Sequence, residues 1–335
     1  MNLMPAEWEP HEATWLSWPK DPETFPGDVL PKVEDIYAQM ISALSAGENV
    51  HVLVDDEKQE ERIRKMLDEA GARKNVLLHR IKTVDVWMRD YGPIFVRDAG
   101  KLKITKWTFN AWGGKYEELM KDDQVVSHIA PMLGMEVLKP GMILEGGSID
   151  VNGKGTLLTT EQCLLNPNRN HHLGKGQIEG QLKEYLGASN IIWLKEGIAG
   201  DDTDGHVDDI ARFVGPKTVL CAVEEHKTDE NYALLRHNFD MLGKAHDQDG
   251  EPLEVKPLPM PGPVRSDYGR LPASYANFYI GNSVVLLPVF KHANDEKAIA
   301  LLEEHFKGRK VVPIYCEPLV WGLGAIHCVT QQQPR

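Results

Sequence analysis

SIDVNGKGTLLTT, residues 148–160, carries two short strand-like stretches on either side of an Asn-Gly pair. Asn-Gly favours the tight turn that joins antiparallel strands, so residues 148–151 and 155–160 are predicted to form a β-hairpin. A helix over 177–186 and a strand over 190–194 are expected to follow. Together these elements make one strand–strand–helix–strand unit.

The same order of elements recurs along the chain, although its copies share no sequence. Three more hairpins, each followed by a helix and a strand, are predicted within 93–107, 207–224 and 276–290. Segment 30–81, with two helices and two strands, can supply a fifth, atypical copy. Repetition of one supersecondary unit, here every ~55–70 residues, favours radial or stacked packing in an α/β fold.

A doubly wound α/β fold is the main alternative, because it also alternates strands and helices. Its nucleotide-binding form would place a G-x-G-x-x-G motif after a strand, and the sequence contains none. No low-complexity linker divides the chain, and the Pro-rich stretch 252–263 is short and interrupted by apolar residues. We therefore expect one catalytic domain over residues 1–335.

The composition favours a small cationic ligand over a polyanionic partner. The 335 residues carry a formal net charge of −13, with 42% hydrophobic and 26% charged residues. Nucleic acids and anionic membrane surfaces attract Lys and Arg, so an acidic chain argues against both. A negative field attracts small cations, although the same charge can serve solubility alone. No apolar stretch reaches the length of a membrane span.

The cysteines indicate a reducing compartment. Cys163, Cys221, Cys316 and Cys328 include no C-x-x-C pair, and four in so long a chain are not a disulfide framework. The first ten residues, MNLMPAEWEP, have no basic stretch followed by an apolar one, so no secretory signal is expected. We expect a cytoplasmic location.

Four polar segments stand near the starts of the predicted units. WMRDYGP (87–93) places Asp90 just ahead of a strand, and ILEGGS (143–148) places Glu145 at the end of an apolar run. A carboxylate in apolar surroundings is costly unless it is paired or functional. The ordinary interpretations are a turn carboxylate paired with Arg89 and a strand-end carboxylate paired with a neighbour.

The third polar segment, GDDTDGHVDDI (200–210), is rich in aspartate. An EF-hand is excluded, because Gly200 and Ala211 would occupy its first and last ligand positions, and a zinc site would need more His or Cys. If the segment enters a strand, His206 and Asp208 point to one face. There they can provide a general base and an anchor for a cation. A solvated acidic turn is the alternative.

The fourth segment, WGLGAIHCVTQQQ (321–333), holds Cys328 in glycine-rich, mostly apolar surroundings. A lone cysteine of this kind is usually a small buried hydrophobe. The polar residues 330–333 are unusual beside a buried stretch, and His206 can activate the thiol if the fold brings the two together. In FNAWGGKY (109–116), Trp112 can pack on an alkyl chain or a cation.

Taken together, these segments resemble the agmatine deiminase family of the guanidine-modifying superfamily, which also includes peptidylarginine and arginine deiminases. The motifs run in order through almost the whole chain: EWEPHEATWLSWP, VWMRDYGP, FNAWGGKY, LEGGS, GDDTDGHVDD, YANFYI and GAIHCVTQQQ. The resemblance implies a five-bladed α/β propeller (pentein) of ββαβ units with pseudo-fivefold symmetry. The repeated unit agrees with that fold.

The resemblance also implies roles for the polar residues. Cys328 would be the nucleophile and His206 the general acid/base, with Glu145 orienting and charging His206. Asp90 and Asp208 would grip the planar guanidinium through paired charge-assisted hydrogen bonds. The implied reaction is hydrolysis of agmatine to N-carbamoylputrescine and ammonia, in putrescine biosynthesis, through a covalent thiouronium. It needs no metal and no organic cofactor.

The far end of the substrate is less defined. The distal ammonium of agmatine should meet an acidic or aromatic pocket, for which Trp87, Trp112, Asp202 and Asp204 are the candidates. Peptidylarginine or arginine deimination is the alternative within the superfamily. A metal-dependent hydrolase built on residues 201–209 and a non-catalytic polyamine binder are alternatives of other classes. The chain can also form a homo-oligomer.

Overall fold

Six small sheets organise the chain. The computed structural model describes residues 2–72, 74–267 and 269–335. One of its sheets has four strands, four have three strands, and one is a two-stranded hairpin of β13 (Arg265–Ser266) and β14 (Gly269–Arg270). The doubly wound alternative is wrong, because the described strands form no long parallel sheet.

The four-stranded sheet joins segments from opposite parts of the chain. Its strands, in spatial order, are β18 (Gln331–Pro334), β1 (His11–Ser17), β2 (Asn49–Val54) and β3 (Val76–Arg80). β18 is antiparallel to β1, and the other neighbours are parallel. The helices α1 (Val29–Leu44) and α2 (Glu57–Glu69) connect the parallel strands, as the spacing of their apolar residues predicts.

The four three-stranded sheets share one topology. In each, the first two strands are antiparallel, the third is parallel to the second, and a helix precedes the third. Their strands are β4 (Ile94–Asp98), β5 (Lys101–Thr105) and β6 (Val137–Leu138); β7 (Asp150–Val151), β8 (Thr156–Thr160) and β9 (Asn190–Leu194); β10 (Ala211–Phe213), β11 (Thr218–Val223) and β12 (Glu254–Pro259); and β15 (Tyr279–Ile280), β16 (Val284–Val289) and β17 (Lys310–Tyr315). Their helices are α5 (Val125–Leu133), α8 (Lys175–Leu186), α9 (Asn231–Leu242) and α10 (Asp295–His305). The predicted unit is thus confirmed in four copies.

The Asn-Gly hairpin forms as the sequence predicts. Val151 in β7 pairs with Leu157 in β8. The Asn152 side chain accepts hydrogen bonds from the amides of Lys154 and Thr156, and Gly153 has a φ of +68°. Only glycine adopts such a backbone without strain, so the turn chemistry sets the register of the sheet.

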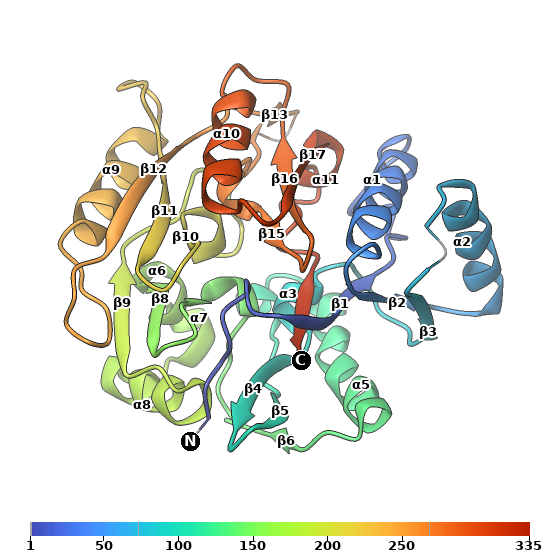
Figure 1. The fold of residues 1–335 in the computed structure, drawn as a ribbon, viewed down its shortest axis with the longest axis horizontal. Helices are drawn as coiled ribbons and strands as arrows, with labels where there is room; N and C mark the ends of the chain where they lie inside the picture. The colour runs from blue at the N-terminus through green and yellow to red at the C-terminus, as the bar shows by residue number, and fades with distance from the viewer. Residues whose placement is uncertain (1, 73, 268) are drawn as a thin grey trace.

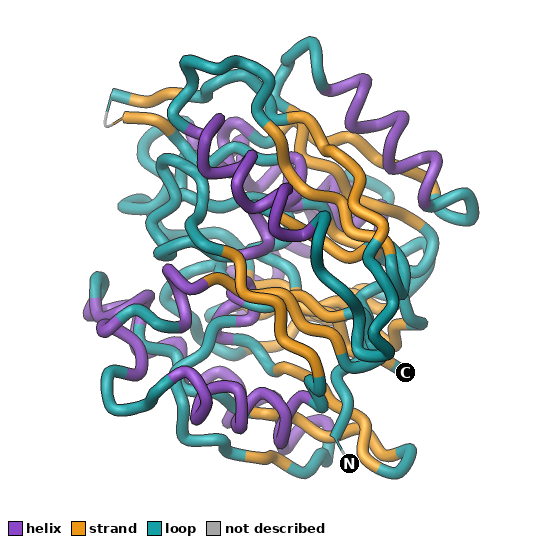
Figure 2. The backbone as a smooth tube through the Cα atoms, turned by 90° about the vertical axis from the view of Figure 1, so that its left-hand side faces the viewer, coloured by secondary structure: helices purple, strands orange, loops and turns teal. Residues whose placement is uncertain are grey.

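The sheets follow one another around the middle of the molecule in chain order (Figure 1). Figure 2, turned by 90°, shows helices along the outer sides of groups of strands. No sheet of described strands closes on itself. The first and last parts of the chain meet where β1 pairs with β18.

Short turns replace the beginnings of several predicted strands. The hairpin predicted within 207–224 does not begin with a strand, because η3 (Val207–Asp209) is a 3-10 turn and β10 begins only at Ala211. The expectation that His206 and Asp208 share a strand face is therefore wrong. Similar turns precede other first strands: α3 (Met88–Tyr91), η2 (Gly146–Ser148) and η4 (Tyr275–Asn277). The remaining short helices are α4 (Ala111–Gly114), η1 (Glu117–Gln124), α6 (Glu161–Leu164), α7 (Pro167–Asn170) and α11 (Glu317–Val320).

The apolar core fills the space between sheets and helices. The largest cluster includes Trp15 and Trp18, both almost fully buried. Two smaller clusters are formed mainly by residues of the units that contain the β7–β9 and β10–β12 sheets. Within the described ranges, no helix has both the length and the apolar character that crossing a membrane requires.

Acidification should weaken the first sheet at one pair of histidines. His51 Nδ1 and His79 Nε2 lie 2.6 Å apart, and the His51 ring stacks on Trp15. Burial, followed by the charge of His79, lowers the pKa of His51 to about 4, and burial lowers the pKa of His79. Because an unfolded histidine has a pKa of about 6.5, the unfolded chain binds more protons, so stability should fall from about pH 6.5 towards pH 4.

Thermal unfolding across this pH range checks the prediction. His51→Phe keeps an aromatic ring for the stack on Trp15 but cannot titrate. Its unfolding midpoint should therefore fall less between pH 7 and pH 5 than that of the wild type, and equal falls would contradict a role for the pair. His226→Phe on the exposed surface is the matched control and should follow the wild type.

Candidate active site

The turns that precede the first strands converge on one place. α3 packs against η2, η2 against η3, and η3 against η4. These turns bring together Asp90, Glu145, His206 and Asp208, and the loop between α11 and β18 adds Cys328. Residues separated by more than two hundred positions therefore share one buried region.

A cavity of about 550 Å³ opens beside this region, and five of the predicted site residues line it: Trp87, Asp90, Trp112, Asp202 and Cys328. Glu145, His206 and Asp208 are buried and do not line the cavity. Asp204 does not line it either. The cavity wall thus carries the Cys328 thiol, several carboxylates including those of Asp90 and Asp202, and aromatic rings. His206 lies behind Asp90, with its Nδ1 3.8 Å from Asp90 Oδ1.

The Cys328 thiol is held by an amide and surrounded by carboxylates. Asn277 Nδ2 donates a hydrogen bond to Sγ at 3.1 Å, and Asp208 Oδ2 lies 4.0 Å from Sγ. Burial raises the pKa of Cys328 well above its usual value, and Asp208, Asp209 and Asp90 raise it further. Without a bound cation, the thiol is therefore protonated at neutral pH.

The two predicted guanidinium-binding carboxylates keep free acceptor capacity. Asp90 accepts from the Gly147 amide and from Trp112 Nε1, each at 3.0 Å, and burial raises its pKa to about 6. Asp208 Oδ2 lies 2.7 Å from His327 Nδ1, whereas its Oδ1 is buried and has no partner among the described residues. A buried oxygen left without a donor is costly, and a ligand carrying N–H groups would satisfy it.

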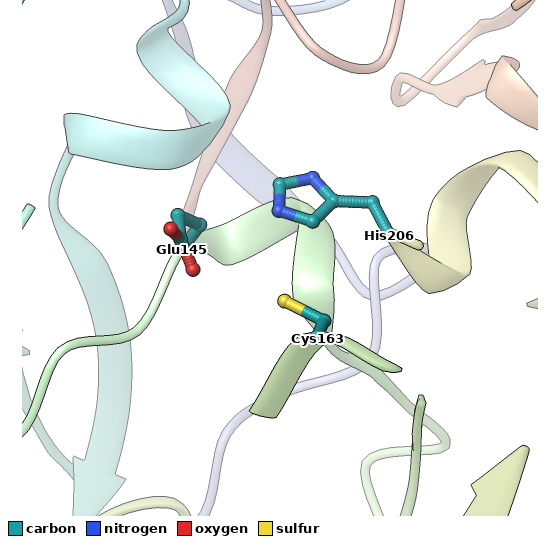
Figure 3. A group of neighbouring side chains, drawn as sticks. All are labelled: Glu145, Cys163 and His206. Carbon is teal, nitrogen blue, oxygen red and sulfur yellow. The ribbon is translucent and has the colours of Figure 1, made fainter. Parts of the chain in front are cut away.

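His206 lies between the carboxylates and a second thiol. Its Nδ1 is 3.8 Å from Asp90 Oδ1. Burial alone would lower the pKa of His206, but the nearby charge of Asp90 and the contact with Cys163 raise it well above its usual value. Figure 3 shows the ring facing Glu145 on one side and Cys163 on another. The ring can therefore hold a proton at neutral pH.

Glu145 forms a buried ion pair with Arg169, a partner that sequence reasoning did not name. Its Oε1 accepts from Arg169 Nε at 2.6 Å, while Oε2 has no partner among the described residues. Arg169 Nη1 also donates to Asp204 Oδ2 at 2.6 Å, and Lys115 approaches Asp204 at 3.0 Å. Asp204 thus holds Arg169, and through it Glu145, from outside the cavity.

The aromatic wall is built around a strained residue. Trp112 has a φ of +54°, which is uncommon for a bulky residue, and its Nε1 donates to Asp90. Trp87 and Tyr116 pack edge-on against Trp112 with ring centroids at 6.3 and 5.9 Å. Tyr116 in turn donates to Asp202 at 2.5 Å. The hydrogen bond from Nε1 holds the indole edge of Trp112 against the Asp90 carboxylate.

A buried charge network supports the thiol loop. Glu7 Oε2 lies 2.8 Å from His327 Nε2 and 3.3 Å from Arg89 Nη2, while Oε1 accepts from Arg212 Nη2 at 2.9 Å. The ordinary interpretation that Arg89 pairs with Asp90 is wrong, because Arg89 contacts Glu7, the His327 carbonyl and Gln332 instead. Because Gln332 accepts a hydrogen bond from Arg89, this polar side chain can lie in the buried strand β18 that follows Cys328.

The aspartates of the third segment are occupied by the segment's own backbone at Asp201 and by side chains from other segments at the rest. Asp201 Oδ2 accepts from the amides of Gly205 and His206, and its Oδ1 accepts from the Thr203 amide. Asp209 accepts from Asn277 Nδ2 at 3.0 Å. These bonds shape the turn that presents His206 and Asp208. From the sequence alone, the aspartates of residues 201–209 could also have formed a metal cluster.

Asn277 and His327 are functional candidates that sequence reasoning did not single out. Both lie in motifs that carry the family resemblance, YANFYI and GAIHCVTQQQ, and this was the available signal. Asn277 Oδ1 accepts from the amides of His327 at 2.8 Å and Cys328 at 3.3 Å, while Nδ2 bridges Sγ and Asp209. One side chain therefore fixes both the thiol and its backbone.

Removing the Asn277 side chain should lower kcat/KM by about ten- to a hundredfold, because a positioned donor to the thiolate is lost. The pH at which iodoacetamide alkylates Cys328 should also move upwards in Asn277→Ala, since the thiolate loses a donor. Asn238→Ala is the matched control, as Asn238 is equally buried but bonds only to the backbone at Lys195 and Glu196. If the pH dependence of Cys328 alkylation is unchanged in Asn277→Ala, the role of Asn277 is purely structural.

Comparison with known proteins places the chain among the deiminases. A family model described as Porphyromonas-type peptidyl-arginine deiminase matches residues 3–334, and the chain belongs to this family. The more particular likeness is to agmatine deiminases. The agmatine deiminase of Ectopseudomonas mendocina is 39% identical, with 99% of this chain and 95% of that protein covered.

Solved structures agree with this likeness. The agmatine deiminase of Enterococcus faecalis has a TM-score of 0.93 at 33% identity, covering 100% of this chain and 96% of its own. A cysteine-to-serine form of the C. jejuni agmatine deiminase with substrate bound has a TM-score of 0.91 at 33% identity, covering 100% and 97%. The α/β fold of this chain is therefore that of agmatine deiminase structures.

Proposed function

We propose that this protein hydrolyses agmatine to N-carbamoylputrescine and ammonia, as a step of putrescine biosynthesis, through a covalent intermediate on Cys328. One observation carries the proposal: a buried thiol faces the cavity with Asp90 beside it and the unpaired Oδ1 of Asp208 behind it. The end-to-end similarity to agmatine deiminases supports agmatine as the substrate.

The guanidinium of the substrate is held by Asp90 and Asp208. Both carboxylates offer lone pairs, and a planar, forked cation suits two acceptors that lie in its plane, each at a different N–H edge. They keep the guanidinium protonated and bring its central carbon next to the thiol. Glu145 acts behind them, where it adds negative charge near His206.

Substrate binding also activates the nucleophile. In the free protein, burial and three aspartates raise the pKa of Cys328. A bound guanidinium offsets the charge of Asp90 and Asp208, so the thiol loses its proton to solvent more easily when substrate is present. The reactive thiolate therefore forms mainly in the complex, which limits side reactions of the free protein.

The first half of the reaction forms the intermediate. The Cys328 thiolate attacks the guanidinium carbon and forms a C–S bond. His206 carries a proton at neutral pH because its pKa is raised, and it gives this proton to the departing nitrogen. The C–N bond breaks, ammonia leaves, and a thiouronium remains on Sγ.

The second half regenerates the thiol. Neutral His206 takes a proton from water while the water oxygen attacks the thiouronium carbon. Collapse breaks the C–S bond while the hydroxyl proton of the adduct passes to the departing sulfur, which restores the Cys328 thiol and releases N-carbamoylputrescine. His206 is then protonated again, as the first half requires.

The alkyl chain and distal amine of agmatine are proposed to lie along Trp87 and Trp112, with Asp202 nearest the ammonium. All three residues line the cavity. Asp204 serves the substrate indirectly, because it holds Arg169 and Lys115. The mouth carries further carboxylates, from Asp21, Glu23, Glu117 and Glu118, that favour a cation.

We also propose that residues 1–335 form one catalytic domain, in which the five larger sheets are the blades of a five-bladed α/β propeller. Their order around the molecule and the pairing of β1 with β18 support this arrangement. A cytoplasmic location and a homo-oligomer stay predictions from the sequence.

Ammonia release from agmatine, free arginine and a peptidyl-arginine tests the substrate. We expect turnover of agmatine, with kcat/KM at least about a hundredfold lower for the other two. An acidic mouth repels the α-carboxylate of arginine, and a peptidyl-arginine has no distal ammonium to pair with Asp202. Turnover of arginine or the peptide in place of agmatine would contradict agmatine as the substrate but would not contradict the proposed mechanism. Loss of activity with a chelator would favour the metal-dependent alternative, and binding of agmatine without ammonia release would favour the polyamine binder.

A further inference from the structure

We propose that Glu145, Cys163 and His206 form a binding site for a zinc-type divalent cation, and that occupation of this site inhibits the enzyme. The three side chains come from separate elements: the residue before η2, helix α6 and the residue before η3. One ligand atom from each lies within 4.8 Å of the other two, and all three residues are buried. Figure 3 shows them facing a common point.

Unpaired polar atoms point to a ligand at this place. Glu145 Oε2 and both ring nitrogens of His206 are buried without a hydrogen-bond partner among the described residues. Side chains of 0% and 1% exposure rarely leave such atoms unsatisfied. A single cation between the three side chains would satisfy a carboxylate oxygen, a ring nitrogen and a thiolate together.

The surroundings match those of bound metals. Protein metal ligands are usually held by hydrogen bonds to their remaining polar atoms. Arg169 holds the other oxygen of Glu145 at 2.6 Å, and Asp90 Oδ1 lies 3.8 Å from His206 Nδ1, so Nε2 is the nitrogen left for a cation. The amide of Cys163 donates to Thr160 Oγ1 at 3.1 Å. Glu145 is therefore oriented by Arg169, and the backbone that carries Cys163 is fixed by Thr160.

The donor set selects the kind of ion. Sulfur, nitrogen and oxygen from three side chains suit Zn²⁺ or Co²⁺ with one open position, whereas Mg²⁺ and Ca²⁺ prefer oxygen alone. Metal–ligand bonds are about 2.0–2.3 Å, so binding would draw the three ligand atoms closer together. The thiol of Cys163 would lose its proton on binding, and thiolate plus carboxylate would balance the charge of the ion.

Occupation would stop turnover without blocking the cavity. None of the three ligands lines the cavity, so substrate can still enter. A cation on Nε2 removes the ring from proton transfer, and we expect kcat to fall while KM for agmatine changes little. The binding itself does not depend on the proposed function, although the inhibition does.

Cobalt binding tests the site without any turnover. Co²⁺ is titrated into the Cys328→Ala protein, which lacks the other thiol of this region. We expect one Co²⁺ per chain and a near-ultraviolet band from thiolate-to-metal charge transfer. The band should vanish when Cys163→Ser is added and persist when Cys221→Ser is added, since Cys221 is an equally buried thiol elsewhere. No band in Cys328→Ala, or a band that survives Cys163→Ser, would overturn the site.

Two further measurements cover the cases in which a variant is unstable or the proposed function fails. Crystals of the wild type soaked in Zn²⁺ should give anomalous scattering between the three side chains, and scattering only at Cys328 or at the surface would contradict the proposal. In turnover assays, micromolar Zn²⁺ should lower kcat of the wild type, and Cys163→Ser should need about ten- to a hundredfold more. Cobalt binding without any ammonia release would keep the metal site and reject the function.

Discussion

Gly147→Ala is expected to lower kcat/KM for agmatine by at least about a hundredfold, because catalytic groups displaced by about 1 Å lose most of their effect. A Cβ at position 147 would lie 2.6 Å from His206 Nδ1 and 3.0 Å from oxygens of Asp90 and Asp208. The Gly147 amide also donates to Asp90. One methyl group would therefore push against three of the proposed catalytic side chains at once.

Gly180→Ala is the matched control. Gly180 lies in helix α8 with no heavy atom within 4 Å of an added Cβ. The control should keep full activity and gain about 0.5–1 kcal/mol in stability, as alanine does in a helix. Steady-state kinetics and thermal unfolding of both variants separate a lost site from a lost fold. A folded Gly147→Ala with wild-type kcat/KM would mean that these side chains do not act on the substrate.

Cys328→Ala is expected to reduce ammonia release from agmatine by at least about a thousandfold, since no other thiol lines the described cavity. The fold should survive, because Asn277 Nδ2 keeps its bond to Asp209 when the sulfur is gone. Mass spectrometry of quenched wild-type reactions should reveal the thiouronium adduct on the peptide that contains Cys328.

Cys316→Ala serves as the control for this variant. Cys316 is fully buried and does not line the cavity, so its loss should cost some stability but little activity. Ammonia release that persists in Cys328→Ala, together with sensitivity to chelators, would overturn the thiol mechanism.

Much of the fold could be predicted because local turn chemistry repeats along the chain. Asn152 and Gly153 fix one hairpin, and the same strand–strand–helix–strand order appears wherever a Gly-containing turn separates apolar stretches. Helix α8 and strand β9 fall where periodicity places them. How the sheets are arranged in space depends on contacts between distant segments, which periodicity does not contain.

The site was harder to predict, because its geometry is set by short turns. His206 and Asp208 were expected on one strand face, yet Asp201 binds the amides of Gly205 and His206 and curls the segment into η3. Apolar alternation cannot reveal a side chain that caps a turn five residues away. Nothing in the local sequence places Cys163 beside His206, so sequence reasoning gives Cys163 no role in the site.

The charge network around Glu7 has a consequence for folding. Glu7 contacts Arg89, Arg212 and His327, which lie 82, 205 and 320 positions further along the chain. Contacts between such distant positions form late, because long loops must close first. In refolding from denaturant, the helical circular-dichroism signal should return before the loop that carries Cys328 reaches its native position. Enzymatic activity would therefore be among the last properties recovered.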